Sequence, residues 1–149
     1  ALFRSLHLGL IPQGQSGLGS LTVKENVLLP AALYGREKER EMRAEALMER
    51  LGIAPLREVC AGELSGGELR RMAIARGLVN DPEIIFADEP TGDLDDDSTK
   101  EVLSLFRSLS REGRSVLMVT HDREAAPYAD RIFRMDKGVI RPEDAAKKE

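Results

Sequence analysis

The chain has 149 residues, of which 32% are charged, a formal net charge of −4 and a single cysteine, Cys60. This is the size of one domain, which can bury a sizeable hydrophobic core. The composition excludes an internal disulfide, and the acidic balance gives no general electrostatic reason to bind nucleic acid or an anionic membrane. No apolar run approaches the roughly 20 residues that span a bilayer.

The first predicted element is a short strand over residues 6–11, because the run is largely apolar and Pro12 stops it. Gln13 follows, and then a glycine-rich loop, Gly14–Ser20. An alternative interpretation is a phosphate-binding loop, but that motif needs a lysine that reaches the phosphates and a hydroxyl that holds magnesium. The sequence has Ser20 and Leu21 in those places. We therefore favour a flexible loop.

The next segment is predicted to be helical. Thr22 and Glu25 have the spacing of a capping box, in which each side chain satisfies the other residue's backbone amide. From Arg36 to Arg50 charges of both signs alternate, with Met42, Leu47 and Leu51 assigned to one side. This pattern predicts an amphipathic helix with a solvated face.

The stretch Leu64–Asp95 is the most informative part of the sequence. Ser65 and Glu68 again have capping-box spacing, and Gly66 and Gly67 leave the first amides of the helix open to an anion. After this helix, Ile84–Ala87 is an unbroken apolar run, which predicts a strand buried on both faces. Asp88 and Glu89 stand at its C-terminal end, where open α/β sheets place their ligands.

The C-terminal third continues the same alternation of helix and strand. Ser98 is placed to cap a helix with apolar residues at helical spacing. Ser115–Thr120 predicts a second buried strand, and His121 follows at its C-terminal end. Arg131–Met135 and Val139–Ile140 flank a turn and predict a hairpin.

These motifs together resemble the ATP-binding domains of ABC transporters. Ser65-Gly66-Gly67 resembles the signature motif, Ile84–Asp88 the Walker B strand, Glu89 the catalytic glutamate and Gly92–Asp95 the D-loop. Gln13 resembles the Q-loop glutamine and His121 the H-loop histidine. The run from Glu89 to Asp95 most resembles the subgroup that serves lipoprotein release and macrolide export.

The resemblance implies an α/β fold of the P-loop NTPase type, a parallel sheet flanked by helices with an α-helical subdomain. Residues 1–21 would be the end of a core strand and the Q-loop, 22–64 the helical subdomain and 65–149 the C-terminal part of the ATPase core. The implied cofactors are ATP and Mg²⁺. Asp88 and Gln13 would contact the metal, and Glu89 would orient or deprotonate the attacking water, helped by Gln13 and His121.

The resemblance also implies partners and a location. Ser65, Gly66, Gly67 and Glu68 would meet a nucleotide held by a second copy, and Asp95 would bridge the two copies. A transmembrane permease would be the other partner, with no nucleic acid involved. The implied location is cytoplasmic, on the inner face of the membrane.

One family motif is not found in the sequence. The Walker A loop and its strand precede the Q-loop in the family, whereas only residues 1–12 precede Gln13 here. We therefore expect the C-terminal two-thirds of an ABC ATPase domain, with the N-terminal strands missing, that does not hydrolyse ATP by itself. Two alternatives stay open: a non-transport ABC protein that acts as a binding module, and an inactive fragment that associates with itself.

Overall fold

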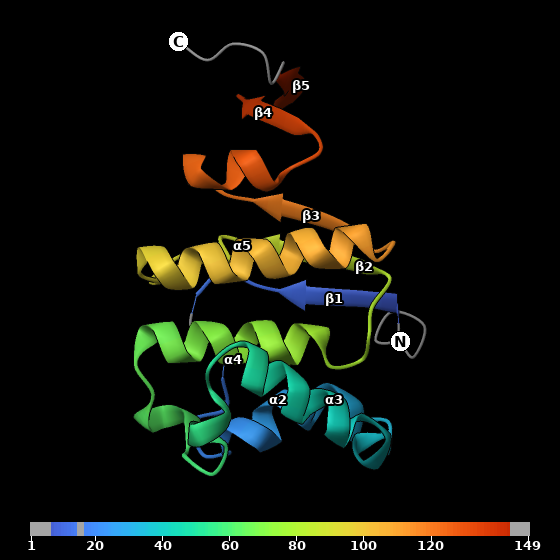
Figure 1. Ribbon diagram of the computed structural model, residues 1–149, viewed down its shortest axis with the longest axis vertical. Coiled ribbons are helices and arrows are strands. Elements are labelled where there is room, and N and C mark those ends of the chain that lie inside the picture. Colours follow the sequence, from blue (N-terminus) through green and yellow to red (C-terminus); the bar gives the residue numbers. More distant parts are fainter. Residues whose placement is uncertain (1–6, 15–16, 144–149) are drawn as a thin grey trace.

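A parallel three-stranded sheet lies in the middle of the molecule (Figure 1). The computed structural model describes residues 7–14 and 17–143. Strands β1 (Leu8–Ile11), β2 (Ile84–Asp88) and β3 (Ser115–Val119) are adjacent in that order. Because all three are parallel, their carboxyl ends meet at one edge of the sheet. The predicted strands are confirmed, with β1 beginning at Leu8, and Leu6 of the predicted strand lies outside the described residues.

Three helices pack together on one side of the sheet in Figure 1. They are α2 (Val23–Ala32), α3 (Glu37–Arg50) and α4 (Gly66–Leu78), and the short helices η1 (Ala54–Leu56) and η2 (Ala61–Glu63) connect α3 to α4. Both predicted capping boxes are confirmed, Thr22 with Glu25 before α2 and Ser65 with Glu68 before α4. These boxes satisfy first-turn amides that a helix cannot bond internally.

Helix α4 comes unusually close to β1. A Cβ atom on Gly9 would lie 2.5 Å from the carbonyl oxygen of Gly77, and one on Gly77 would lie 2.7 Å from a side-chain carbon of Ile11. Two glycines therefore permit a contact that any other pair of residues would push apart. The contact places the loop that follows β1 next to α4.

The hydrophobic core lies on one face of the sheet. Ile11, Ile85 and Ala87 are buried there against α4 and α5 (Asp96–Arg111). The opposite face is open: Phe86 is 38% exposed and Val119 is 60% exposed. The prediction that β2 and β3 are buried on both faces is therefore wrong. Side chains alternate along a strand, and within residues 7–14 and 17–143 helices cover only one face.

Two further predictions are wrong in detail. Met42 is 87% exposed, because the buried stripe of α3 runs through Ala44, Leu47 and Met48 to Leu51. Ser98 does not cap α5; Asp95 does, and Ser98 donates its amide to the Asp95 carboxylate. An ionised carboxylate is the stronger acceptor at a helix N-terminus.

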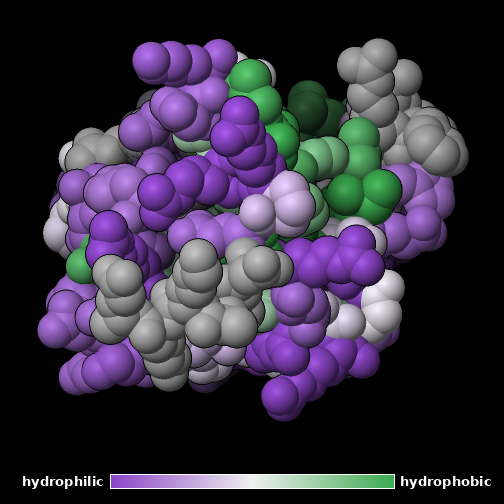
Figure 2. Space-filling view, turned by 90° about the horizontal axis from the view of Figure 1, so that it is seen from above, coloured by the Kyte–Doolittle hydropathy of each residue, from purple (hydrophilic) through white to green (hydrophobic). Residues whose placement is uncertain are grey.

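Beyond β3 the chain forms η3 (Arg123–Tyr128) and a separate hairpin of β4 (Ile132–Asp136) and β5 (Val139–Glu143). Among the described residues β3 pairs only with β2, and β4 only with β5. When the molecule is viewed from the end that carries the hairpin, apolar side chains gather in one patch on a mostly hydrophilic surface (Figure 2). None of the helices in the described part of the chain is long and apolar enough to cross a bilayer.

Candidate active site

Glu89 occupies a fixed and strained position just after β2. Its amide donates to the carbonyl oxygen of Val119 at 2.8 Å, which completes the last pair of β2 and β3, Asp88 with Val119. Its φ of 45° lies in the left-handed region, which is uncommon for residues other than glycine. The amide of Gly92 closes a turn on the Glu89 carbonyl. Strained residues of this kind cluster at functional sites.

Three hydrogen bonds hold the Glu89 carboxylate. The Thr120 hydroxyl donates to Oε2 at 3.0 Å, and the His121 amide donates to Oε1 at 3.1 Å. The His121 ring nitrogen Nδ1 lies 2.8 Å from the same Oε1. The Glu89 side chain is 18% exposed whereas the His121 side chain is 88% exposed. One side of the pair is therefore anchored in protein and the other faces solvent.

These contacts shift both pKa values. Burial raises the pKa of Glu89, but the hydrogen bonds from His121 and Thr120 outweigh burial and hold that pKa below its usual value. The hydrogen bond to Glu89 and the charge of the carboxylate raise the pKa of His121. Each shift therefore favours the charged form of its group, the carboxylate of Glu89 and the protonated imidazole of His121.

Asp88 and Gln13 lie at the same edge of the sheet, both exposed, because β1 and β2 end side by side. Among the described residues, none forms a hydrogen bond or ion pair with the Asp88 carboxylate, and no three His, Cys, Asp or Glu side chains group as a metal site. A carboxylate and an amide oxygen are hard ligands that suit Mg²⁺, which is typically bound through one or two carboxylates and substrate phosphates. The residues present therefore fit that ion.

The signature residues lie at the start of α4 rather than beside Glu89. The Glu68 carboxylate accepts from the amide and the hydroxyl of Ser65, at 2.8 and 2.7 Å. A Cβ atom on Gly67 would lie 3.4 Å from the carbonyl oxygen of Asp93. The D-loop therefore packs on the first turn of the signature helix, and glycine permits that contact.

Asp95 is engaged within its own chain. Its Oδ1 accepts from the Ser98 amide at 2.9 Å and its Oδ2 from the Ser98 hydroxyl at 3.0 Å. The backbone hydrogen bond from Ser98 is the largest of the contacts that lower the pKa of Asp95. The residue that the resemblance assigns to the contact between copies also caps α5.

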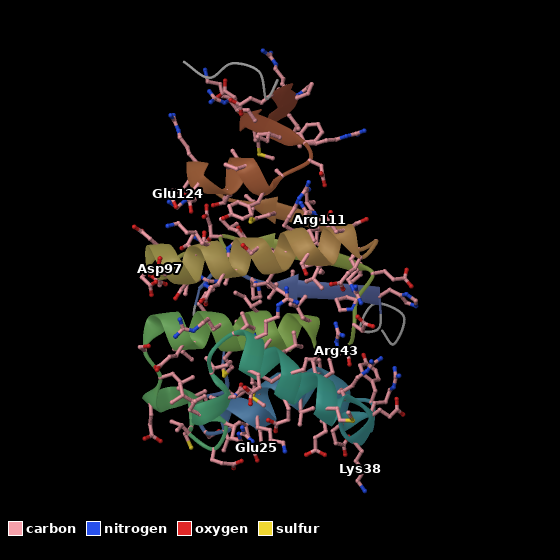
Figure 3. The ribbon with its side chains drawn as sticks, in the orientation of Figure 1. Glu25, Lys38, Arg43, Asp97, Arg111 and Glu124 are labelled. Carbon is pink, nitrogen blue, oxygen red and sulfur yellow. The ribbon has the colours of Figure 1, made fainter. Side chains whose placement is uncertain are left out.

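A cavity of about 270 Å³ adjoins Glu89 and His121. Its lining includes the carboxylates of Asp96, Asp122 and Glu124. Figure 3 labels Asp97 and Glu124 at the end toward which the strands point, and Arg43 and Arg111 toward the other end. Of the predicted site residues, the structure brings Glu89 and His121 into this cavity, whereas Gln13, Asp88 and the signature residues lie outside its lining.

Two residues in contact with this machinery were not predicted. Thr120 donates a hydrogen bond to Glu89. The sequence feature that could have indicated Thr120 is its position directly before His121, at the end of a predicted strand. Arg70 is 3% exposed and donates to the carbonyl oxygen of Pro12 at 2.9 Å, so it ties the signature helix to the residue before Gln13. No sequence signal marks Arg70, since neighbouring Arg71 has the same side chain.

Comparison with known proteins identifies the family. A family model described as ABC transporter matches residues 3–92, which is more than half of the chain. The chain belongs to the ABC transporter family.

Two relatives agree with the predicted subgroup. The macrolide export ATP-binding/permease protein MacB of Neisseria meningitidis serogroup B is 46% identical over 141 residues, which are 94% of this ABC transporter chain and 22% of that protein. The protein of the same name from Shewanella sp. strain ANA-3 is 43% identical over 141 residues, with the same coverage. The chain therefore spans 22% of the length of these relatives.

Solved structures confirm the predicted fold class. A dimeric bacterial ABC transporter cassette superposes with a TM-score of 0.87 at 33% identity, covering 95% of this chain and 64% of that one. A dimeric ATP-binding cassette in a post-hydrolysis state, bound to ADP and phosphate, gives a TM-score of 0.84 at 31% identity with the same coverage.

Proposed function

We propose that this chain supplies the Walker B, D-loop and H-loop part of a cassette that hydrolyses ATP. The carboxylate of Glu89, fixed at the carboxyl end of β2 with His121 Nδ1 at 2.8 Å, carries the proposal. This acid–base pair lies at the carboxyl ends of parallel strands, which is where open α/β folds bind their ligands. Its exposed side leaves room for a phosphate and a water.

Each site residue then has one task. Glu89 accepts a hydrogen bond from the attacking water, or its proton, as a general base does. His121, whose pKa is raised by Glu89, presents an exposed imidazole to the γ-phosphate. Asp88 and Gln13, at adjacent strand ends, would hold the metal ion. Mg²⁺ bound there would supply positive charge that neutralises phosphate charge.

The signature residues act on a second nucleotide. The amides of Gly66 and Gly67 begin α4, where the helix dipole and unpaired donors favour an anion. Gly66 and Gly67 are not among the residues that line the cavity beside Glu89. This supports a head-to-tail pair of copies, in which the signature residues of each copy would meet the nucleotide of the other and Asp95 would lie at the contact.

The relatives support a proposal about the partners of this chain. Two proteins named as macrolide export ATP-binding/permease proteins are similar to nearly the whole chain. We propose an ATP-binding unit of a transporter that drives export or lipoprotein release, working with a membrane permease on the cytoplasmic face of the membrane. The run from Glu89 to Asp95 supports that subgroup.

The test uses a complete cassette, meaning a chain that contains this sequence together with a lysine-bearing phosphate loop. Glu89→Gln should leave Mg-ATP affinity unchanged and lower turnover by roughly 10²–10⁴-fold, because the general base is lost while the shape is kept. The matched control is Glu83→Gln, at an exposed position just before β2, which should leave turnover unchanged. Full turnover in the Glu89 variant would show that another group handles the water.

A further inference from the structure

We propose that Thr120 is a positioning residue that holds Glu89 in its working orientation through the hydroxyl of its side chain. The inference rests on the proposed function, because it gives Thr120 a task in the same reaction. Thr120 itself is not expected to touch the nucleotide. Its hydroxyl lies 3.0 Å from Glu89 Oε2, on the side of the carboxylate away from His121 Nδ1.

The pairing of two strands sets this contact. Asp88 is opposite Val119 in the parallel register of β2 and β3, and Glu89 and Thr120 are the residues that directly follow this last pair. The hydrogen bond from the Glu89 amide to Val119 fixes the register at this point. Neighbouring side chains at the end of two paired strands have little freedom to separate, so the contact is built into the sheet.

The direction of the hydroxyl proton is also determined. Thr120 Oγ1 accepts a hydrogen bond from the amide of Asp122 at 3.0 Å. With that amide directed at the oxygen, the hydroxyl proton is available for Glu89. A residue of the same shape without the hydroxyl would leave both the Asp122 amide and Glu89 Oε2 without this partner.

Together with His121, Thr120 restrains the carboxylate from both ends. The His121 amide and ring bind Oε1, and Thr120 binds Oε2. Loss of the Oε2 contact would leave the side chain free to rotate about the axis of its remaining bonds. A base that rotates spends less time aligned with the water, so the rate falls while nucleotide binding is unaffected.

The first test uses the chain itself without nucleotide. The ¹³C chemical shift of the Glu89 carboxyl carbon, measured by NMR at one fixed pH in metal-free buffer, should move in Thr120→Val and return to the wild-type value in Thr120→Ser. Thr120→Ala and Thr120→Val differ in size but both lack the hydroxyl. The Glu89 carboxyl shift should therefore move in the same direction in both variants. An unchanged shift in both Val and Ala variants would overturn the proposal.

The second test separates positioning from stability in the complete cassette. Thr120→Val should lower kcat about 10-fold or more with KM within about twofold, and Thr120→Ser should restore the rate. In a Glu89→Gln background Thr120→Val should cause no further loss, because two residues that act through one contact are not additive.

The outcomes distinguish this inference from the proposed function. If Glu89→Gln lowers turnover but Thr120→Val does not, the role of Thr120 is wrong and the proposed function stands. If Glu89→Gln leaves turnover unchanged, the role proposed for Glu89 as general base fails, and the role of Thr120 fails with it whatever Thr120→Val does. A fall in kcat that Thr120→Ser does not restore assigns Thr120 to packing and also overturns the inference.

Discussion

The Glu89 carboxylate and the His121 imidazole lie 2.8 Å apart, although 32 positions separate them in the sequence. The parallel pairing of β2 and β3 brings them together, since each residue follows the end of its strand. The contact raises the pKa of His121 and contributes to the lowered pKa of Glu89. Folding stability must therefore depend on pH through this pair.

The sign of that dependence follows from the two shifts. The contribution of His121 is complete below its ordinary pKa of 6.5 and is lost as pH rises through its raised pKa. The contribution of Glu89 is present above its ordinary pKa of 4.5 and is lost as pH falls through its lowered pKa. We expect His121→Ala to lower the melting temperature most between these values and least in alkaline solution. If the difference in melting temperature between wild type and His121→Ala did not change with pH, the ion pair would be contradicted. In a Glu89→Gln background, the pH dependence of that difference should disappear.

The chain by itself is expected to bind nucleotide weakly. Ser20 and Leu21 occupy the positions at which a phosphate loop over Gly14–Ser20 would need lysine and a hydroxyl, and Gln15 and Ser16 lie outside the described residues. Without that lysine, Mg-ATP affinity should be about millimolar at best, with no ATPase activity above background. Calorimetry measures the affinity. A micromolar dissociation constant for Mg-ATP would contradict this expectation and would favour the alternative that Gly14–Ser20 binds phosphate.

Association through an open strand edge is a third expectation. Among the described residues β3 has no partner on its outer side, and Ser115–Val119 carries no charge or proline to discourage pairing. Leu117 and Val119 are more than half exposed. Open apolar edges recruit other chains, so the chain should be a dimer or larger at micromolar concentration by light scattering. Leu117→Lys should shift it toward monomer; a wild-type monomer with a cooperative melt would contradict this idea.

A surface ion-pair network should link α3 to the core. Asp81 Oδ1 forms an ion pair with Arg43 of α3 at 2.8 Å, and it accepts a hydrogen bond from Arg114, just before β3, at 2.5 Å. Asp81 is 39% exposed, so solvent screens these pairs, and Asp81→Asn should lower the free energy of unfolding by roughly 1 kcal/mol. Its φ of 60° suits asparagine, so Asp81→Ala should cost about 1 kcal/mol more.

This network also predicts a response to acid. Burial raises the pKa of Asp81, but the hydrogen bond from Arg114 and the charge of Arg43 outweigh it and lower the pKa below its ordinary 3.8. The contribution of Asp81 is therefore present at neutral pH and lost as pH falls through that lowered value. Urea unfolding of wild type and Asp81→Asn should differ at pH 7 and converge in strong acid. A constant difference would exclude the charge as the cause.

Local features were predictable from the sequence alone. The capping boxes of Thr22 and Ser65 depend on residues three positions apart, and the strand over Ile84–Ala87 depends on a continuous apolar run. The resemblance to one family also rests on consecutive residues, the run from Glu89 to Asp95. Each of these needs only the chain's own neighbours, so no tertiary context can easily override it.

The tertiary structure decided what depends on distant partners. An apolar run cannot say which faces of a strand are covered, so Phe86 and Val119 were wrongly assigned to a buried core. The contact of Thr120 with Glu89 depends on the register of β2 and β3, because a shift of one residue would turn the hydroxyl to the other face of the sheet.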